Sequence, residues 1–494
     1  ATRSITSTDF HSTPNAYEWS SVAHASTSRT IYDTNDMSDP FDDWPFYSDS
    51  TVWITATGGS TAQWRFWYKY GGVDATLRAL FSDGHEESWR WWFAWETDWT
   101  EAVITWTLPG DAVGVALEFD YHHSERWTRG LEISSNGNTI RGLQIINFPY
   151  DGILIMNAND NVIGGNRSLG SGPLGQGNLI SANGGHGIQI CGESANNRIL
   201  GNYIGTDLYG SSPMSNTYSG VALQCSPGPH DNTIGGTTAS TRNLISGNAQ
   251  NGVSLSESSH DNAVVGNYIG TDATGTAAIP NSGDGVFINS GANYNLIGGS
   301  NATPGGACTG ECNLISGNGS SGIGINGSGT MSNTVSGNYI GTDVNGINAV
   351  GNGWDGILIT GDASNNVIGG TTADERNLIS GNDRVGVSIN GYDGSTGENV
   401  VRGNYIGTDA NGTNALGNGV VDAYTGVEIY YSSGNTVENN LISGNNGHGV
   451  VIQGDTSTGN VVQGNYIGTN ISGTSALGNS YSGCLLYTSP SPRD

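Results

Sequence analysis

The sequence is poor in basic residues: it contains a single lysine, Lys69, and its 16 basic residues face 44 acidic ones, which gives a net charge of −28. Proteins that bind a phosphate backbone depend on clustered lysine and arginine, so this balance argues against a nucleic-acid partner. Apolar runs of about 18 residues are also missing, so we expect no membrane-spanning helix in this sequence. Only 12% of the residues are charged, which is too few for a charged disordered chain.

Glycine, in contrast, is abundant, with 78 residues. A helical protein would need glutamate, lysine, alanine and leucine instead. A chain that turns every few residues needs glycine, asparagine, serine and threonine in quantity. The composition therefore favours a solenoid.

Two short motifs alternate along most of the chain with a period of about 65 residues. The first motif is GNYIGTD at 201–207, 266–272, 337–343 and 403–409, and GNYIGTN at 464–470. The second is NLISAN at 178–183 and NLISGN at 243–248, 313–318, 377–382 and 440–445. A glycine followed by apolar residues and an asparagine followed by β-branched residues separate the motifs, so each turn of chain carries three short strands.

Strands this short are unstable in isolated hairpins, but they become stable when near-identical strands stack above and below them. Asparagines that recur at equal positions can then form amide ladders between turns. The sequence therefore predicts an all-β fold over 128–483: a right-handed, three-sheet parallel β-helix of about ten turns, rising about 4.8 Å per turn.

The alternating units NLISGN and GNYIGTDATG resemble the parallel β-helix repeats of the pectin-lyase-like superfold, and above all those of bacterial extracellular repeat proteins. The resemblance implies the fold and an extracellular or cell-surface location. It does not define an activity, because this superfold hosts lyases, hydrolases, epimerases, adhesins and tail spikes.

Residues 1–127 differ from the repeats, since they hold 12 of the 13 tryptophans. Apolar residues alternate there with period two, which predicts an antiparallel β-sandwich-like domain. Trp67 and Trp92 lie opposite the main apolar faces of their strands. They could bind sugar rings, or they could seal this domain, as a cap, against the β-helix.

Five aspartates, Asp33, Asp36, Asp39, Asp42 and Asp43, crowd one short segment of this domain. They are candidate ligands for Ca²⁺, and the alternative is a solvated acidic loop. We expect no other cofactor to be required.

At the other end, the repeat pattern breaks at Cys484. Residues 484–494 match the translation of a sequencing adapter, so we expect them not to be native and the β-helix to stop in mid-strand. Two prolines in this segment also oppose continued β pairing.

Cys308 and Cys312 lie in one glycine-rich loop and are expected to form a disulfide, because no second Cys or His pair nearby would complete a zinc site. A disulfide indicates an oxidising compartment. The pairing of Cys191 and Cys225 stays open.

The tyrosine of the first motif recurs on every second turn. Pointing outward, these rings would offer stacking platforms for a polysaccharide; because leucine holds the position on the intervening turns, the alternative is packing beneath long loops. The candidate residues are Tyr203, Tyr268, Tyr339, Tyr405 and Tyr466. The aspartates of the same motif, with Asn470, are best explained as turn-forming residues.

We assign no catalytic residue from the sequence. The two GHG motifs, at His186 and His448, resemble part of the catalytic centre of polygalacturonases, but the other motifs of that family are missing, so corner residues are the better interpretation. Arg376 and Arg384 lie beside acidic residues in the sequence, and we interpret them as surface pairs.

Two functions follow. The first is a secreted or cell-surface structural or binding protein that contacts a polysaccharide or cell-surface glycan. The alternative is a polysaccharide lyase or glycoside hydrolase of the pectin-lyase-like fold. Three or more clustered acids in a groove would favour the enzyme, and evenly spread polar loops would favour the binding protein.

Overall fold

The structure is a computed structural model that describes residues 128–391, 396–420 and 424–487, together with the backbone of eight strands between residues 16 and 121. The chain divides into two units, residues 1–128 and residues 129–494. No described helix is long and apolar enough to cross a membrane.

The strands of the first unit pair antiparallel in two four-stranded sheets, ordered β2-β1-β4-β7 and β3-β8-β5-β6. They are β1 (Ala16–Ser21), β2 (Arg29–Tyr32), β3 (Ile54–Thr55), β4 (Thr61–Tyr68), β5 (Gly71–Phe81), β6 (Glu86–Glu96), β7 (Thr100–Thr107) and β8 (Ala112–Tyr121). The sandwich-like packing of these sheets stays a prediction.

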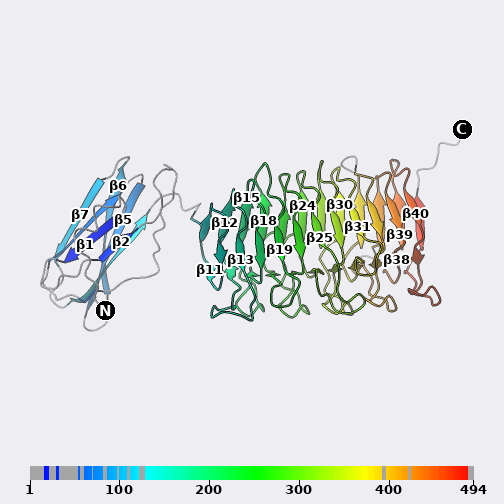
Figure 1. Ribbon diagram of the computed structural model, residues 1–494, viewed down its shortest axis with the longest axis horizontal. Helices are drawn as coiled ribbons and strands as arrows, with labels where there is room; N and C mark the ends of the chain where they lie inside the picture. Colours follow the sequence, from blue (N-terminus) through cyan, green and yellow to red (C-terminus); the bar gives the residue numbers. More distant parts are fainter. Residues whose placement is uncertain are drawn as a thin grey trace. The chain divides into compact units, whose positions relative to one another are not determined.

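The second unit is a right-handed parallel β-helix with three sheets, whose turns stack along the long axis (Figure 1). Sheet 1 consists of β9 (Leu131–Ile133), β12 (Ile153–Met156), β15 (Ile188–Cys191), β18 (Val221–Gln224), β21 (Val253–Leu255), β24 (Val286–Asn289), β27 (Ile323–Asn326), β30 (Ile357–Thr360), β33 (Val387–Asn390), β36 (Val427–Tyr430), β39 (Val450–Gln453) and β42 (Cys484–Tyr487).

Sheet 2 consists of β10 (Thr139–Ile140), β13 (Val162–Gly164), β16 (Arg198–Leu200), β19 (Thr233–Gly235), β22 (Ala263–Val265), β25 (Leu296–Gly298), β28 (Thr334–Ser336), β31 (Val367–Gly369), β34 (Val400–Arg402), β37 (Thr436–Glu438) and β40 (Val461–Gln463).

Sheet 3 consists of β11 (Gln144–Ile146), β14 (Leu179–Ser181), β17 (Tyr203–Ile204), β20 (Leu244–Ile245), β23 (Tyr268–Ile269), β26 (Leu314–Ile315), β29 (Tyr339–Ile340), β32 (Leu378–Ile379), β35 (Tyr405–Ile406), β38 (Leu441–Ile442) and β41 (Tyr466–Ile467).

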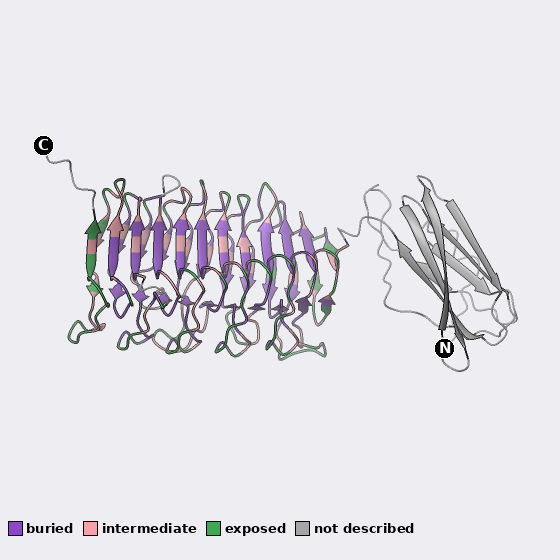
Figure 2. Cartoon of the chain, turned by 180° about the vertical axis from the view of Figure 1, so that it is seen from behind, coloured by how far each residue is buried: buried purple, intermediate pink, exposed green. Residues whose placement is uncertain are grey.

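The interior of the β-helix is filled by isoleucine and valine from all three sheets, and the strands of sheet 1 are largely buried in Figure 2. On sheet 1, Ile357 and Ile359 point inward and are fully buried, and their neighbours on the next turn are Val387 and Ile389. Burying one such side chain stabilises the fold by about 1.5–3 kcal/mol. Because the pairing is in register, each aliphatic side chain packs on an equivalent one in the next turn.

Asparagine ladders line all three corners, as the sequence predicts. At one corner the Asn338 Nδ2 group donates hydrogen bonds to Asn377 Oδ1 (3.1 Å) and to the Ile297 carbonyl (2.8 Å). The Asn338 Oδ1 atom in turn accepts a hydrogen bond from Asn313 Nδ2 (2.9 Å). The ladders satisfy buried backbone groups where the chain changes direction.

The glycine of the GTD motif is required by the same corner geometry. Gly407 has a φ of 89°, and an added Cβ would lie 2.3 Å from Asn445 Oδ1 of the neighbouring ladder. A side chain would therefore be strained in its backbone conformation and would also clash with the ladder.

The three parallel sheets confirm the predicted β-helix of about ten turns: sheets 2 and 3 each have eleven strands, and the first turn begins at Leu131, inside the predicted range, without either repeat motif. Cys484–Tyr487, where the repeat pattern breaks, form β42 and pair in register with β39. The origin of residues 484–494 stays a prediction, and residues 488–494 lie outside the described part.

Candidate functional site

A column of side chains stands at the corner that leads into sheet 1, one residue before the corner glycine of each turn. Asp151 Oδ1 accepts a hydrogen bond from the backbone N–H of His186 (2.8 Å), and His186 Nδ1 accepts one from Ser219 N–H (3.2 Å). His448 Nδ1 accepts one from Ser482 N–H in the same way (3.0 Å). We call this set the corner column.

The two histidines of the GHG motifs are therefore corner residues. The His186 ring packs 5.3 Å from the Tyr218 ring, and His448 lies at the same centroid distance from Tyr481. Burial lowers the pKa of His186 to about 4, so this imidazole stays neutral at ordinary pH and its Nδ1 atom can accept the hydrogen bond from Ser219 N–H.

Three aspartates of the corner column, Asp151, Asp284 and Asp355, have raised pKa values. Asp284 Oδ1 accepts a hydrogen bond from Ser321 N–H (2.8 Å), and Asp355 Oδ1 accepts one from Val385 N–H (3.0 Å). Burial raises the pKa of both carboxyl groups, and that of Asp355, which is only 5% exposed, reaches about 6. The negative charge of Asp284 raises the pKa of Asp355 further, whereas the hydrogen bond from Val385 N–H and the positive charge of Arg384 lower it.

Glu428 is the third acid of this region and points outward from the middle of β36. Its pKa is raised first by burial and then by the charge of Asp355, whereas Arg384 lowers it. The two carboxyl groups therefore interact across the turn that carries Arg384.

Trp354, Arg384 and Tyr424 hold one corner position on three successive turns, two residues before the corner glycine. The Arg384 guanidinium lies 4.9 Å from the Trp354 ring centroid and 4.8 Å from that of Tyr424. Cation–π contacts of this kind fix the guanidinium beside the acids. Trp354 is nevertheless 49% exposed, so much of its surface is open to solvent.

Together Asp284, Asp355, Glu428, Arg384 and Trp354 form the acidic cluster, which spans five turns or about 19 Å of sheet 1 and its corner. It combines a carboxyl group that holds its proton near pH 6, a second carboxyl group, a cation and an open aromatic ring. Such a set can donate a proton, accept one and stack on a sugar ring.

Sequence analysis missed this cluster. Arg384 was interpreted as part of a surface pair with an acidic residue beside it in the sequence. In the structure Arg384 contacts two aromatic rings instead, and Arg376 lies in a loop over sheet 3. Only the repeat register, which aligns Trp354, Arg384 and Tyr424, could have revealed the cluster.

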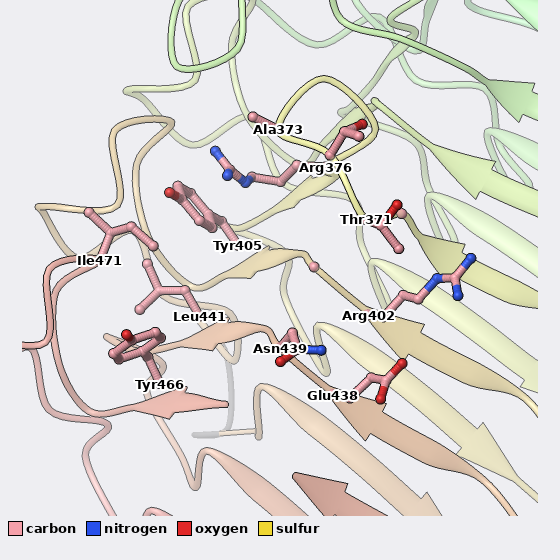
Figure 3. A pocket seen from close by; sticks show the side chains of 13 residues that line it. Thr371, Ala373, Arg376, Arg402, Tyr405, Glu438, Asn439, Leu441, Tyr466 and Ile471 are labelled. Carbon is pink, nitrogen blue, oxygen red and sulfur yellow. The ribbon is translucent and has the colours of Figure 1, made fainter. Parts of the chain in front are cut away.

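The tyrosine column lies on the outer face of sheet 3, and loops cover most of it. Tyr268, Tyr339 and Tyr405 are buried in a second apolar cluster outside the β-helix, together with the leucines of the alternate turns. Tyr203 is half-buried beneath Arg167. Tyr466 alone of the five is exposed, and it lies beside a hollow in this surface (Figure 3). Packing beneath loops therefore accounts for four of the five rings.

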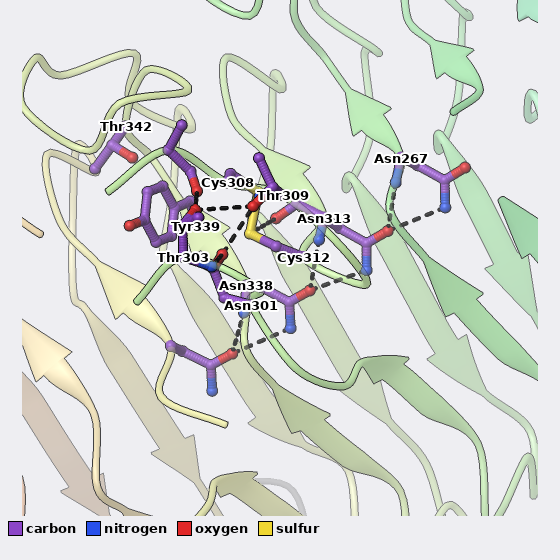
Figure 4. The surroundings of a disulfide bond; sticks show 12 residues. Asn267, Asn301, Thr303, Cys308, Thr309, Cys312, Asn313, Asn338, Tyr339 and Thr342 are labelled. Carbon is purple, nitrogen blue, oxygen red and sulfur yellow. Dashed lines mark hydrogen bonds between the residues drawn. A yellow bond between two sulfur atoms is a disulfide. The ribbon is translucent and has the colours of Figure 1, made fainter. Parts of the chain in front are cut away.

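A disulfide joins Cys308 to Cys312 and forms part of this cover (Figure 4). The same loop receives a hydrogen bond from the Tyr339 hydroxyl, which donates to the Gly306 carbonyl (2.5 Å). A second disulfide joins Cys191 to Cys225 on adjacent turns. This settles the pairing that the sequence left open.

The aspartates of the GTD motif close turns. Asp409 Oδ1 accepts hydrogen bonds from the N–H groups of Thr413 (2.8 Å) and Asn414 (3.1 Å), and Asn470 Oδ1 accepts one from Thr474 N–H (3.1 Å). Burial raises the pKa of Asp409, but these hydrogen bonds outweigh it, so the net shift is downward.

Several predicted site residues cannot be placed. The side chains of Trp67, in β4, and of Trp92, in β6, lie outside the described part of the structure. The candidate Ca²⁺ ligands Asp33, Asp36, Asp39, Asp42 and Asp43 also lie outside it. Among the residues that are described, no three His, Cys, Asp or Glu side chains are arranged to hold a metal ion.

The fold defines a class, the three-sheet parallel β-helices, and solved structures of this class are similar to the chain. No protein-family profile and no curated protein sequence matches it. The mannuronan C-5 epimerase AlgE4 A-module of Azotobacter vinelandii is 14% identical, with a TM-score of 0.32 over 72% of this chain and 77% of that one. The periplasmic alginate epimerase AlgG is 12% identical, with a TM-score of 0.35 over 68% and 77%. The Agl-KA catalytic domain is 11% identical, with a TM-score of 0.30 over 89% and 91%.

Proposed function

We propose that this chain binds a polysaccharide across the acidic cluster and hydrolyses its glycosidic bonds, with Asp355 as the proton donor. One observation carries the proposal: burial keeps the Asp355 carboxyl group protonated up to about pH 6, and the residue before it in the chain is the half-exposed Trp354. A carboxylic acid with a raised pKa next to a sugar-stacking surface is what proton donation to a leaving oxygen requires.

The second carboxyl group completes the reaction. We assign the role of base to Glu428, whose pKa is raised by burial and by the charge of Asp355 and lowered by Arg384. In the proposed step the glycosidic oxygen takes the proton of Asp355 as its bond to the anomeric carbon breaks. Water attacks that carbon and gives a proton to Glu428, which balances the reaction.

A location outside the cytosol is part of the proposal. It is supported by the two disulfides, Cys191–Cys225 and Cys308–Cys312, because such bonds persist in oxidising compartments.

The test is product release from a panel of neutral and acidic polysaccharides, measured as new reducing ends. Wild type should release oligosaccharides from at least one member, and Asp355→Asn should lower the rate by at least about 100-fold, the usual contribution of a general acid. Glu193→Gln, an exposed residue remote from the cluster, is the matched control and should leave the rate unchanged. Equal rates for wild type and Asp355→Asn would refute the proposal.

A binding protein without catalysis is the second candidate. The hydrogen bond from Val385 N–H to Asp355 repeats the one from His186 N–H to Asp151, and this likeness favours a purely structural role for the carboxyl group. Retention of a glycan with no product at any pH would support this second candidate.

A further inference from the structure

Two histidines lie side by side at the corner between sheet 1 and sheet 2. His230 lies between β18 and β19, and His260 holds the equivalent position on the next turn, between β21 and β22. Their backbones pair in parallel register, and their rings stack with centroids 5.0 Å apart and an angle of 4° between the ring planes. We call these two residues the histidine pair.

The sequence builds the pair from a repeated tripeptide, His-Asp-Asn, at 230–232 and 260–262. The asparagines belong to a buried ladder, in which Asn232 Nδ2 donates a hydrogen bond to Asn262 Oδ1 (3.0 Å), so the two turns are held in register. The aspartates that precede them have φ angles of 54° and 53°, in the left-handed region that aspartate tolerates better than most residues. In this conformation each carboxylate meets the ring of the histidine before it.

Each aspartate thereby fixes the position of a proton on its histidine. His230 Nδ1 lies 2.8 Å from Asp231 Oδ2. His260 Nδ1 lies at the same distance from Asp261 Oδ2. An ionised carboxylate can only accept a hydrogen bond, so Nδ1 carries the donated hydrogen and the lone pair of each neutral imidazole is on Nε2. Metal-binding histidines commonly have a carboxylate behind the ring, because it orients the ring and makes the other nitrogen more basic.

The two Nε2 lone pairs point in the same direction. The rings are parallel, the backbones are in register and each ring makes the same contact with the next residue, so the Nε2 atoms are about as far apart as the centroids, at 5.0 Å. Two nitrogens at about 2.0–2.1 Å from one tetrahedral Zn²⁺ are about 3.4 Å apart, so each Nε2 atom has to move by about 0.8 Å. The side chains of His230 and His260 are 33% and 39% exposed, which leaves the rings room to tilt.

We infer that the histidine pair binds one divalent transition-metal ion, of the class Zn²⁺, Cu²⁺ or Ni²⁺, through its two Nε2 atoms. Imidazole nitrogen suits these ions, whereas Ca²⁺ and Mg²⁺ require oxygen ligands. The carboxylates of Asp231 and Asp261, behind the rings, partly balance the charge of the ion. With two protein ligands, the ion keeps further coordination positions for water or for an oxygen atom of a bound molecule.

This inference does not depend on the proposed hydrolysis. The histidine pair lies at the corner that leaves sheet 1, after β18 and β21. The acidic cluster lies on sheet 1 and at the opposite corner, on the turns from β24 to β36. The two sites can therefore fail separately.

Calorimetric titration of the full chain with Zn²⁺ in excess Ca²⁺ tests the inference. Ca²⁺ occupies carboxylate sites and does not compete for imidazole nitrogen. His230→Asn and His260→Asn should each weaken the binding of one Zn²⁺ ion by at least about tenfold, because even the loss of an outer partner of a ligand costs that much. Asparagine is the native residue at this position on the following turn, Asn293, so both variants should keep the circular dichroism spectrum of wild type.

His448→Asn is the matched control. It removes another partly exposed imidazole, and the corner column already holds asparagine at the equivalent Asn251, so Zn²⁺ binding should not change. Zn²⁺ binding by His230→Asn and His260→Asn equal to that of wild type, no Zn²⁺ binding by wild type, or loss of the bound ion in excess Ca²⁺ would overturn the inference. A wild type that binds the ion at the histidine pair but releases no product from any polysaccharide would support this inference and count against the hydrolysis alone.

Discussion

Replacing Asp355 by asparagine should make the protein more stable at high pH. In the folded state burial raises the pKa of this carboxyl group from 3.8 to about 6, so the native protein holds the proton more tightly than the unfolded chain does. Its contribution to stability is therefore fully present below pH 3.8 and is lost as the pH rises through about 6. At 1.36 kcal/mol per pKa unit, the ionised group costs about 3 kcal/mol at pH 8.

Asparagine is close in shape and cannot ionise, and its Oδ1 atom can still accept the hydrogen bond from Val385 N–H. Asp355→Asn should therefore raise the unfolding midpoint at pH 8 and change it little at pH 4. The assay is thermal and urea unfolding followed by far-ultraviolet circular dichroism at both pH values. Glu193→Gln is the exposed control. A variant that is destabilised at pH 8 by as much as at pH 4 would refute the reasoning.

Three further outcomes follow from the structure. Asn338→Asp should destabilise the β-helix by about 3 kcal/mol or more, because the new carboxylate oxygen would face the Ile297 carbonyl and Asn377 Oδ1 without a donor. The measurement is the urea midpoint of unfolding, compared with that of the exposed control variant Asn411→Asp. Gly407→Ala should cost about 2 kcal/mol or more through strain and the clash with the ladder, and a midpoint equal to wild type would contradict it. The rate of any glycan cleavage should fall as the pH rises above about 6, where Asp355 loses its proton, and a rate that keeps rising to pH 8 would contradict its role as the acid.

Most of the β-helix could be predicted because the same short sequence pattern recurs in every repeat. Short strands with inward aliphatic residues, corner glycines and ladder asparagines recur at fixed positions, so the three sheets and the ladders follow from spacing alone. The first turn lies inside the predicted range but carries neither motif, and β9 and β10 still pair in register with the next turn.

The acidic cluster could not be predicted in the same way. Apart from the adjacent Trp354 and Asp355, its successive members lie 29 to 70 residues apart in sequence and come together only through the stacking of turns. The raised pKa of Asp355 depends on burial and on neighbours from other turns, and neither property is visible in a local motif. The tyrosine column, in contrast, could be recognised from the repeated motif. Whether a loop covers each ring depends on loop length, which differs from turn to turn.

The most direct test of the central claim is the pKa of Asp355 itself. Infrared difference spectra between wild type and Asp355→Asn, recorded across a pH titration, isolate the band of this one protonated carboxyl group. The account predicts that the band persists at pH 5 and disappears with a midpoint of about 6. A midpoint near the ordinary value of 3.8 would contradict it, because an acid that is already ionised cannot donate the proton.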